Sequence, residues 1–169
     1  MYRMSIMTMA APPSLSSRLN VPRCTKMALV HDMAESLVGD ITPVDTHVPK
    51  SEKARREAAV MEYISKDLLG GVAGGTLFGT DILEVFREYE DSETLESKFV
   101  HDIDKLELLL QMVEYERDRG VNLGEFCHVA KRIQLPEVKE WSATVIREHE
   151  EAINGIKTAA AETKENGKA

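Results

Sequence analysis

One histidine and three acids lie close together in the stretch MALVHDMAESLVGD, residues 27–40. His31 and Glu35 are four residues apart, so a helix would place both side chains on one face. Asp32 would lie about 100° round the helix from His31, which still lets these three side chains point into one cleft. The apolar residues before His31 indicate a buried helix, and a buried carboxylate is costly unless it is paired or binds a metal.

Histidine and carboxylates together suit Mn, Fe, Co or Zn, and Mg where oxygen ligands dominate. Asp40 follows Gly39, where the chain turns and can add another oxygen. Neighbouring residues on one helix cannot enclose an ion, so a second segment must contribute. The candidate is Asp104 in KFVHDIDKLELLLQMVEYE, at the border of an apolar stripe, whereas Asp102 is expected to point toward solvent.

Composition limits the class of protein. The chain has 169 residues, 43% of them hydrophobic, which is enough for one globular domain. Its net charge of −8 and the lack of a basic patch argue against binding to a nucleic-acid polymer. A small phosphorylated substrate would need a bound cation to supply positive charge.

The cysteines and the apolar runs bear on location. Cys24 and Cys127 are far apart and outside any C-x-x-C spacing, so no disulfide is expected and a reducing compartment fits. No apolar run approaches the ~20 residues that a membrane helix needs, and no signal peptide is recognised. We therefore predict the cytoplasm, with the nucleus as the alternative, and no membrane partner.

The periodicity predicts an all-α protein without convincing strands or repeats. Asn20 is expected to cap one helix, Gly39 to end it, and Ser51 to cap the next. These features indicate one domain over residues 1–154 and a polar tail, 155–169, that frays. Helices are predicted over residues 1–11, 20–38, 51–69, 80–90, 93–117, 123–133 and 136–153, with loops at PPSLSS and DITPVDTHVP.

Two apolar stripes are expected to face the core. One comprises Ala54, Ala58, Met61 and Ile64, and the other Phe99, Ile103, Leu106, Leu110 and Val113. KSEKARRE can meet a substrate phosphate, but a solvated helix face is the default interpretation. GGVAGGTLFGTD lacks the Gly-Lys-Ser/Thr ending of a phosphate loop and is interpreted as a connection between helices. His101 is interpreted as a surface residue.

Five strings carry a resemblance to a known family: YRM, ALVHDMAESLVGDITP, KSEKARRE, EYE and KFVHDIDKLELLLQMVEYE. They resemble the HD-domain metal-dependent phosphohydrolases and, more narrowly, the HD-domain-containing protein 2 group of 5'-deoxynucleotidases. The bare HD dipeptide is nonspecific; the extended string with the later Asp is specific. The resemblance covers residues 2–115. It implies an all-α HD-domain helical bundle, a homodimer, and hydrolysis of deoxyribonucleoside 5'-monophosphates to nucleoside and phosphate.

The resemblance also implies roles for individual residues. His31, Asp32 and Asp104 match ligands of the principal divalent cation, which would be Mn²⁺, Co²⁺ or Mg²⁺. Glu35 and Asp40 match acids that bind a second metal or act in acid–base catalysis, and the Ile41 carbonyl joins them. Such a cation would lower the pKa of bound water and clamp phosphate oxygens.

One ligand of the family pattern has no match. In close relatives a further histidine directly precedes the residues that align with Met1–Met4, and none of His47, His101, His128 and His149 occupies a matching position. Two interpretations follow: a truncated sequence, which a first helix without a cap favours, or a short form with a damaged site. The alternatives to a 5'-deoxynucleotidase are an HD phosphohydrolase of cyclic or hyperphosphorylated nucleotides, and a non-catalytic helical dimer partner or nucleotide binder.

Overall fold

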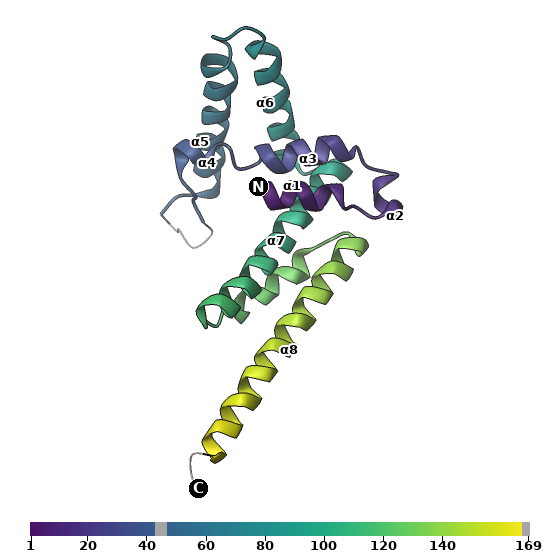
Figure 1. Ribbon diagram of the computed structural model, residues 1–169. Coiled ribbons are helices and arrows are strands. Elements are labelled where there is room, and N and C mark those ends of the chain that lie inside the picture. Colours follow the sequence, from purple (N-terminus) through teal and green to yellow (C-terminus); the bar gives the residue numbers. More distant parts are fainter. Residues whose placement is uncertain (43–46, 167–169) are drawn as a thin grey trace. The chain divides into compact units, whose positions relative to one another are not determined.

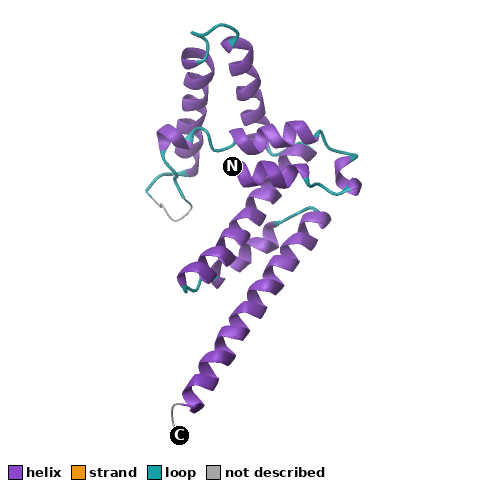
Figure 2. Ribbon diagram, in the orientation of Figure 1, coloured by secondary structure: helices purple, strands orange, loops and turns teal. Residues whose placement is uncertain are grey.

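The computed structural model describes residues 1–42 and 47–166, with side chains up to residue 153. Every regular element in these ranges is a helix, which confirms the all-α prediction (Figure 2). The chain folds as two compact units, Met1–His101 and Asp102–Ala169, so the predicted domain boundary at 154 stays a prediction. No helix in the part that the structure describes is long and apolar enough to cross a membrane.

Unit 1 begins with α1 (Tyr2–Met9), α2 (Pro13–Ser16) and α3 (Val21–Val30). α1 packs on α3 (Figure 1), and the Thr8 and Thr25 hydroxyls lie 2.9 Å apart at this contact. Asn20 caps α3 as predicted, because its side chain accepts a hydrogen bond from the Arg23 amide. The prediction of a loop at PPSLSS is wrong, since Pro13 starts a short helical turn there.

The helix predicted over residues 20–38 is interrupted before its end. α3 ends at Val30, four residues of turn follow, and α4 (Glu35–Val38) is a separate single turn. The amide of Glu35 donates to the carbonyl of Asp32, so the chain is wound more tightly here than in an α-helix. Gly39 ends α4 as predicted, with a φ of 82°.

A helical hairpin completes most of unit 1. α5 (Lys50–Glu62) continues as a π-helix, Tyr63–Leu68, and α6 (Gly75–Asp91) returns beside it (Figure 1). Ser51 is not the cap, because α5 starts one residue earlier after Pro49. α6 also starts earlier than predicted. The loop predicted before α5 is confirmed where the structure describes it; its residues 43–46 lie outside the described part.

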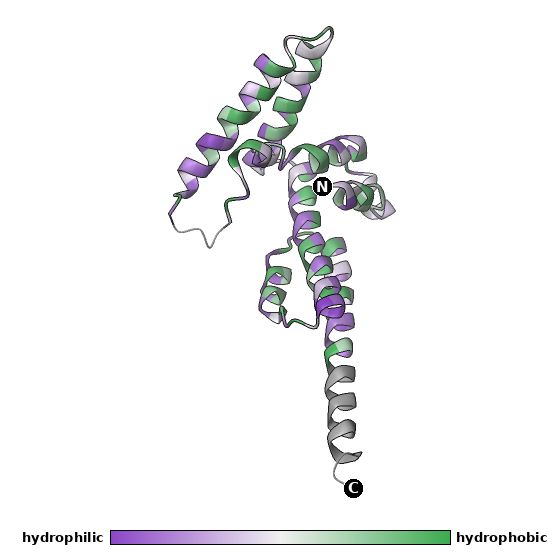
Figure 3. Ribbon diagram, turned by 60° about the vertical axis from the view of Figure 1, so that its left-hand side comes forward, coloured by the Kyte–Doolittle hydropathy of each residue, from purple (hydrophilic) through white to green (hydrophobic). Residues whose placement is uncertain are grey.

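The buried face of α5 differs from the predicted stripe. Met61 and Ile64 are buried as expected, but Ala54 and Ala58 are exposed, and Glu57 takes the inward position. Figure 3 shows hydrophilic residues gathered in the first turns of α5. The periodicity was correct over the second half of the helix only, because alanine contributes too little apolar area to fix a face.

Unit 2 contains most of α7 (Leu95–Arg119), a 3₁₀ helix (Gly124–Arg132) and α8 (Pro136–Asn166). Its buried apolar side chains are Ile103, Leu106, Leu109, Met112, Val129, Ile133, Val138 and Val145. The stripe on α7 therefore runs through Leu109 and Met112, while Leu110 and Val113 are half-buried. The helix predicted over residues 136–153 continues as α8 to Asn166, and the fraying predicted from residue 155 stays a prediction.

Candidate functional site

His31 is the first residue after α3 and is 5% exposed. Its Nδ1 lies 3.1 Å from the Ala28 carbonyl oxygen, and since a carbonyl only accepts, Nδ1 carries the hydrogen in this bond. In the neutral ring Nε2 then holds the lone pair that a metal needs. The hydrogen bond to the last turn of α3 thus leaves Nε2 as the ring nitrogen that can bind a metal.

Asp32 lies against this nitrogen. Its Oδ2 is 3.0 Å from His31 Nε2. Two acceptors at this distance repel each other unless a proton or a cation lies between them. Burial opposes ionisation of Asp32, but when a proton lies between the two atoms, the hydrogen bond from His31 and its charge outweigh burial and lower the pKa of Asp32. The pair therefore fits a shared cation.

Glu35 begins α4, and the turn at Gly39 brings the following backbone back toward it. Partial burial raises the pKa of Glu35, and the charges of Asp32 and Asp40 raise it further. The charges of Asp32 and Asp40 thus act on the Glu35 carboxylate. An acid with a raised pKa can hold a proton for transfer near neutral pH.

Lys53 and Glu57, on α5, were missed by the sequence interpretation, which treated KSEKARRE as a solvated face. Lys53 Nζ donates to the Ile41 carbonyl oxygen at 2.9 Å and lies 3.7 Å from Glu35 Oε1. It also lies 3.5 Å from Glu57 Oε1, a side chain that is 11% exposed. The signal was available, because Lys53, Glu57, Met61 and Ile64 recur at helical spacing.

A second histidine, His101, is linked to His31 through the ring of Tyr89. Tyr89 contacts the His31 ring edge-on at 5.0 Å, and its own ring lies 3.9 Å from that of His101. His101 Nε2 is 3.0 Å from the Tyr89 carbonyl oxygen and 2.7 Å from Ser92 Oγ. The interpretation of His101 as a plain surface residue is wrong, since its ring packs on Tyr89, which in turn contacts the His31 ring.

Four of the expected metal ligands, all in unit 1, lie in two pairs. The structure pairs His31 with Asp32 and links Glu35 with Ile41 through Lys53. Among residues 1–42 and 47–166, no three His, Cys, Asp or Glu side chains are close enough to hold a metal by themselves. The assignment of these ligands stays a prediction.

Asp104 and Asp102 belong to unit 2, where they differ in environment. Asp104 is half-buried. Asp102 is fully buried and accepts hydrogen bonds from the amides of Gln134 and Leu135, at 2.9 and 2.7 Å, just before α8. The expectation that Asp102 points to solvent is wrong, because it caps the start of another helix.

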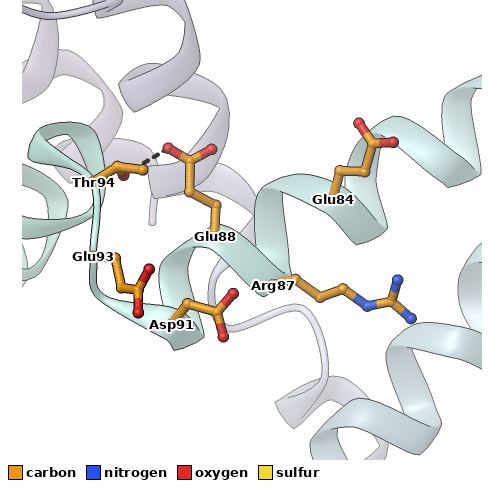
Figure 4. A pocket seen from close by; sticks show the side chains of 6 residues that line it. All are labelled: Glu84, Arg87, Glu88, Asp91, Glu93 and Thr94. Carbon is orange, nitrogen blue, oxygen red and sulfur yellow. Dashed lines mark hydrogen bonds between the residues drawn. The ribbon is translucent and has the colours of Figure 1, made fainter.

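A surface hollow of about 350 Å³ on unit 1 contains none of the expected site residues (Figure 4). It is lined by Glu84, Arg87, Glu88, Asp91, Glu93 and Thr94. Thr94 Oγ1 donates to Glu88 Oε1 at 2.7 Å, and Arg23 pairs with the other oxygen of Glu88. Glu88 thus joins α6 to neighbouring segments, and the hollow is an acid-lined surface depression rather than the site.

Comparison with known proteins decides the family. A family model described as an HD domain matches residues 1–141. The chain belongs to the HD-domain family. HD-domain phosphohydrolases generally depend on a divalent metal, and the His31–Asp32 pair described above has the donor atoms for one.

Similar HD-domain proteins carry names that state an activity. The chain is 46% identical over 154 residues to the 5'-deoxynucleotidase hdd1 of Schizosaccharomyces pombe, covering 89% of the chain and 74% of that protein. It is 41% identical to the 5'-deoxynucleotidase YBR242W of Saccharomyces cerevisiae, covering 86% and 60%. It is 37% identical to the 5'-deoxynucleotidase HDDC2 of Xenopus laevis, covering 90% and 73%.

Solved structures show the same HD-domain fold. The HD domain-containing protein YGK1 superposes with a TM-score of 0.69 and 31% identity, over 88% of this chain and 74% of that chain. A conserved hypothetical protein from Pyrococcus furiosus superposes with a TM-score of 0.65 and 25% identity, over 89% and 80%. The predicted HD-domain helical fold is confirmed.

Proposed function

We propose that this HD-domain chain is a metal-dependent 5'-deoxynucleotidase. The observation that carries the proposal is its 46% identity, over 89% of its length, to a relative named for that activity. The reaction is hydrolysis: a bond forms between the water oxygen and phosphorus, the bond from phosphorus to the 5' oxygen breaks, and a proton passes to that leaving oxygen. The products are a deoxyribonucleoside and phosphate.

The principal cation is assigned to His31 and Asp32, with Asp104 added from the resemblance alone. When bound, a divalent cation supplies an acidified water and positive charge for the phosphate oxygens. The Ala28 carbonyl holds the His31 ring in the tautomer that presents Nε2, and the Tyr89 ring fixes its plane. These contacts keep the His31 lone pair and Asp32 Oδ2 convergent before any substrate arrives.

Glu35 and Asp40 are assigned to acid–base work and to a second cation, together with the Ile41 carbonyl. The raised pKa of Glu35 suits a group that keeps a proton and passes it to the leaving 5' oxygen. Lys53 adds a positive charge beside it, which offsets part of the negative charge of the acids and of the substrate. The surroundings thus move the pKa values of the two acids apart, lowering that of Asp32 and raising that of Glu35.

A phosphate-release panel tests the substrate class. Metal-stripped chain is supplied with Mn²⁺, Co²⁺ or Mg²⁺ and offered deoxyribonucleoside monophosphates, ribonucleoside monophosphates and cyclic nucleotides. We expect phosphate from the deoxyribonucleoside monophosphates, with at least one cation and at a higher kcat/KM than from the ribonucleotides. Cyclic nucleotides are followed by chromatography, because opening the ring gives a nucleoside monophosphate and releases no phosphate. Turnover of cyclic nucleotides alone would contradict the proposal.

The homodimer and the cytoplasmic location are part of the same proposal and rest on the family resemblance and the composition. Light scattering coupled to size exclusion measures the mass directly. We expect twice the chain mass at micromolar concentration, and a stable monomer mass would contradict the homodimer.

A further inference from the structure

The Lys53 ammonium lies among three oxygen atoms from three segments of unit 1. Its Nζ lies 2.9 Å from the Ile41 carbonyl oxygen, in the loop after α4. It lies 3.7 Å from Glu35 Oε1 at the start of α4 and 3.5 Å from Glu57 Oε1 on α5. Two of these three oxygens belong to residues that the proposed function assigns to a second cation.

This arrangement matches the surroundings of a small hard cation. Carboxylate and backbone carbonyl oxygens are the ligands that Mg²⁺ and Ca²⁺ take in proteins, and the lysine ammonium is itself a compact point charge. Lys53 is therefore a stand-in ion that marks where positive charge is stable in the structure. A divalent cation bound to the same oxygens would lie within about 4 Å of the ammonium, where like charges repel strongly.

We propose that the Lys53 ammonium is a built-in occupant of the second cation position, and that a divalent cation binds Glu35 and the Ile41 carbonyl only when Lys53 moves away. This inference rests on the assignment of Glu35 and Ile41 in the proposed function. Lys53 acts as a positioning residue: it holds the loop after Gly39 against α5 while the second cation is absent.

Lys53 has the freedom that this exchange requires. Its side chain is 30% exposed on a flexible four-carbon stem, so the ammonium can rotate toward water. Glu57, four residues along α5, can keep the charge paired after Ile41 is released. The affinity for the second cation is thus set by competition, which makes it weaker than it would be without the Lys53 charge.

Counting bound Mn²⁺ by electron paramagnetic resonance on the metal-stripped chain tests the competition without turnover. Lys53→Met removes the charge and keeps the aliphatic stem, and Lys53→Arg keeps the charge. Lys66→Met is the matched control, because Lys66 also pairs with a glutamate four residues away, Glu62, at 2.9 Å, but is distant from the site acids in sequence. We expect Lys53→Met to bind its second Mn²⁺ about tenfold more tightly or better than wild type.

Wild type, Lys53→Arg and Lys66→Met should share one Mn²⁺ isotherm. An isotherm of Lys53→Met that coincides with wild type, or is weaker, would overturn the proposal. So would a rise in KM for the nucleotide with Mn²⁺ binding unchanged, because Lys53 would then serve the substrate phosphate. If the proposed function itself is wrong, metal-loaded wild type releases no phosphate. That result does not depend on how the Mn²⁺ isotherms of wild type and Lys53→Met compare.

A measurement on the wild-type chain decides the matter if Lys53→Met does not fold. Reductive methylation with isotopic formaldehyde labels exposed lysine amines, and mass spectrometry reads each site. Saturating Mg²⁺ should raise the labelling rate of Lys53 severalfold and leave that of Lys66 unchanged. An unchanged rate at Lys53 with Mg²⁺ bound would refute the exchange.

Discussion

Replacement of Asp102 by alanine should destabilise unit 2 strongly. The Asp102 carboxylate is fully buried and accepts two backbone hydrogen bonds, at 2.9 and 2.7 Å, from the residues that precede α8. These two hydrogen bonds make up the helix cap, and each amide left without an acceptor costs about 1–3 kcal/mol. Because Gln134 is exposed and water can replace part of the loss, we expect about 3 kcal/mol in total.

Urea denaturation measures this loss. With a slope of about 2 kcal/mol per molar, the midpoint should fall by about 1.5 M. Asp118→Ala is the control: the Asp118 side chain is 67% exposed near the end of α7, and its removal should cost less than about 0.5 kcal/mol. Equal midpoints for Asp102→Ala and Asp118→Ala would refute the capping role.

Substitutions at Asp102 and Asp104 are expected to affect different properties, stability in the first case and activity in the second. Asp104 is two residues beyond Asp102 and carries the ligand assignment. Asp104→Ala should therefore abolish phosphate release while moving the urea midpoint little, whereas Asp102→Ala should act mainly through folding. A reversed pattern would show that the acids were assigned the wrong way round.

Three further outcomes follow from the structure. Gly79→Ala should cost about 1–3 kcal/mol in thermal or urea unfolding, because an added Cβ would lie 2.3 Å from the Ser65 carbonyl oxygen; a neutral result would contradict that close approach. Burial raises the pKa of the Cys24 thiol to about 12, so Ellman's reagent at pH 8 should modify Cys127 in the folded chain and reach Cys24 only after unfolding; fast modification of both would contradict this. The raised pKa of Glu35 means that the folded metal-free chain keeps this proton to a higher pH than the unfolded chain, in which the pKa of Glu35 is near 4.5. Wild type should therefore lose stability relative to Glu35→Gln as the pH rises from 4.5 through the folded pKa. Melting temperatures of the two chains in chelator that change in parallel from pH 4 to 7 would refute the shift.

The sequence predicted the helical class, the cap at Asn20, the stop at Gly39 and the buried lead-in to His31. These features depend on local rules: a capping side chain, a left-handed glycine and an apolar run before polar residues. The interruption after Val30 was not predictable, because the tighter winding of residues 31–34 is not encoded by any proline or glycine there.

The polar interior of unit 1 was harder to predict. Lys53 and Glu57 have the composition of a solvated helix face, and only the fold shows that they point at Glu35 and Ile41. Asp102 was misjudged for the same reason: its partners lie more than thirty residues away, and helical periodicity alone cannot distinguish an acid that faces water from one that caps a distant helix.

The central claim is that the HD pair is the core of a metal-dependent 5'-deoxynucleotidase. Its most direct test is phosphate release from deoxyadenosine monophosphate by wild type and Asp32→Ala, each stripped with chelator and then resupplied with Mn²⁺ or Co²⁺. We expect release by wild type only after the cation is returned, and a loss of at least about a hundredfold in Asp32→Ala. Equal rates in the two chains, or full activity in chelator, would contradict the account.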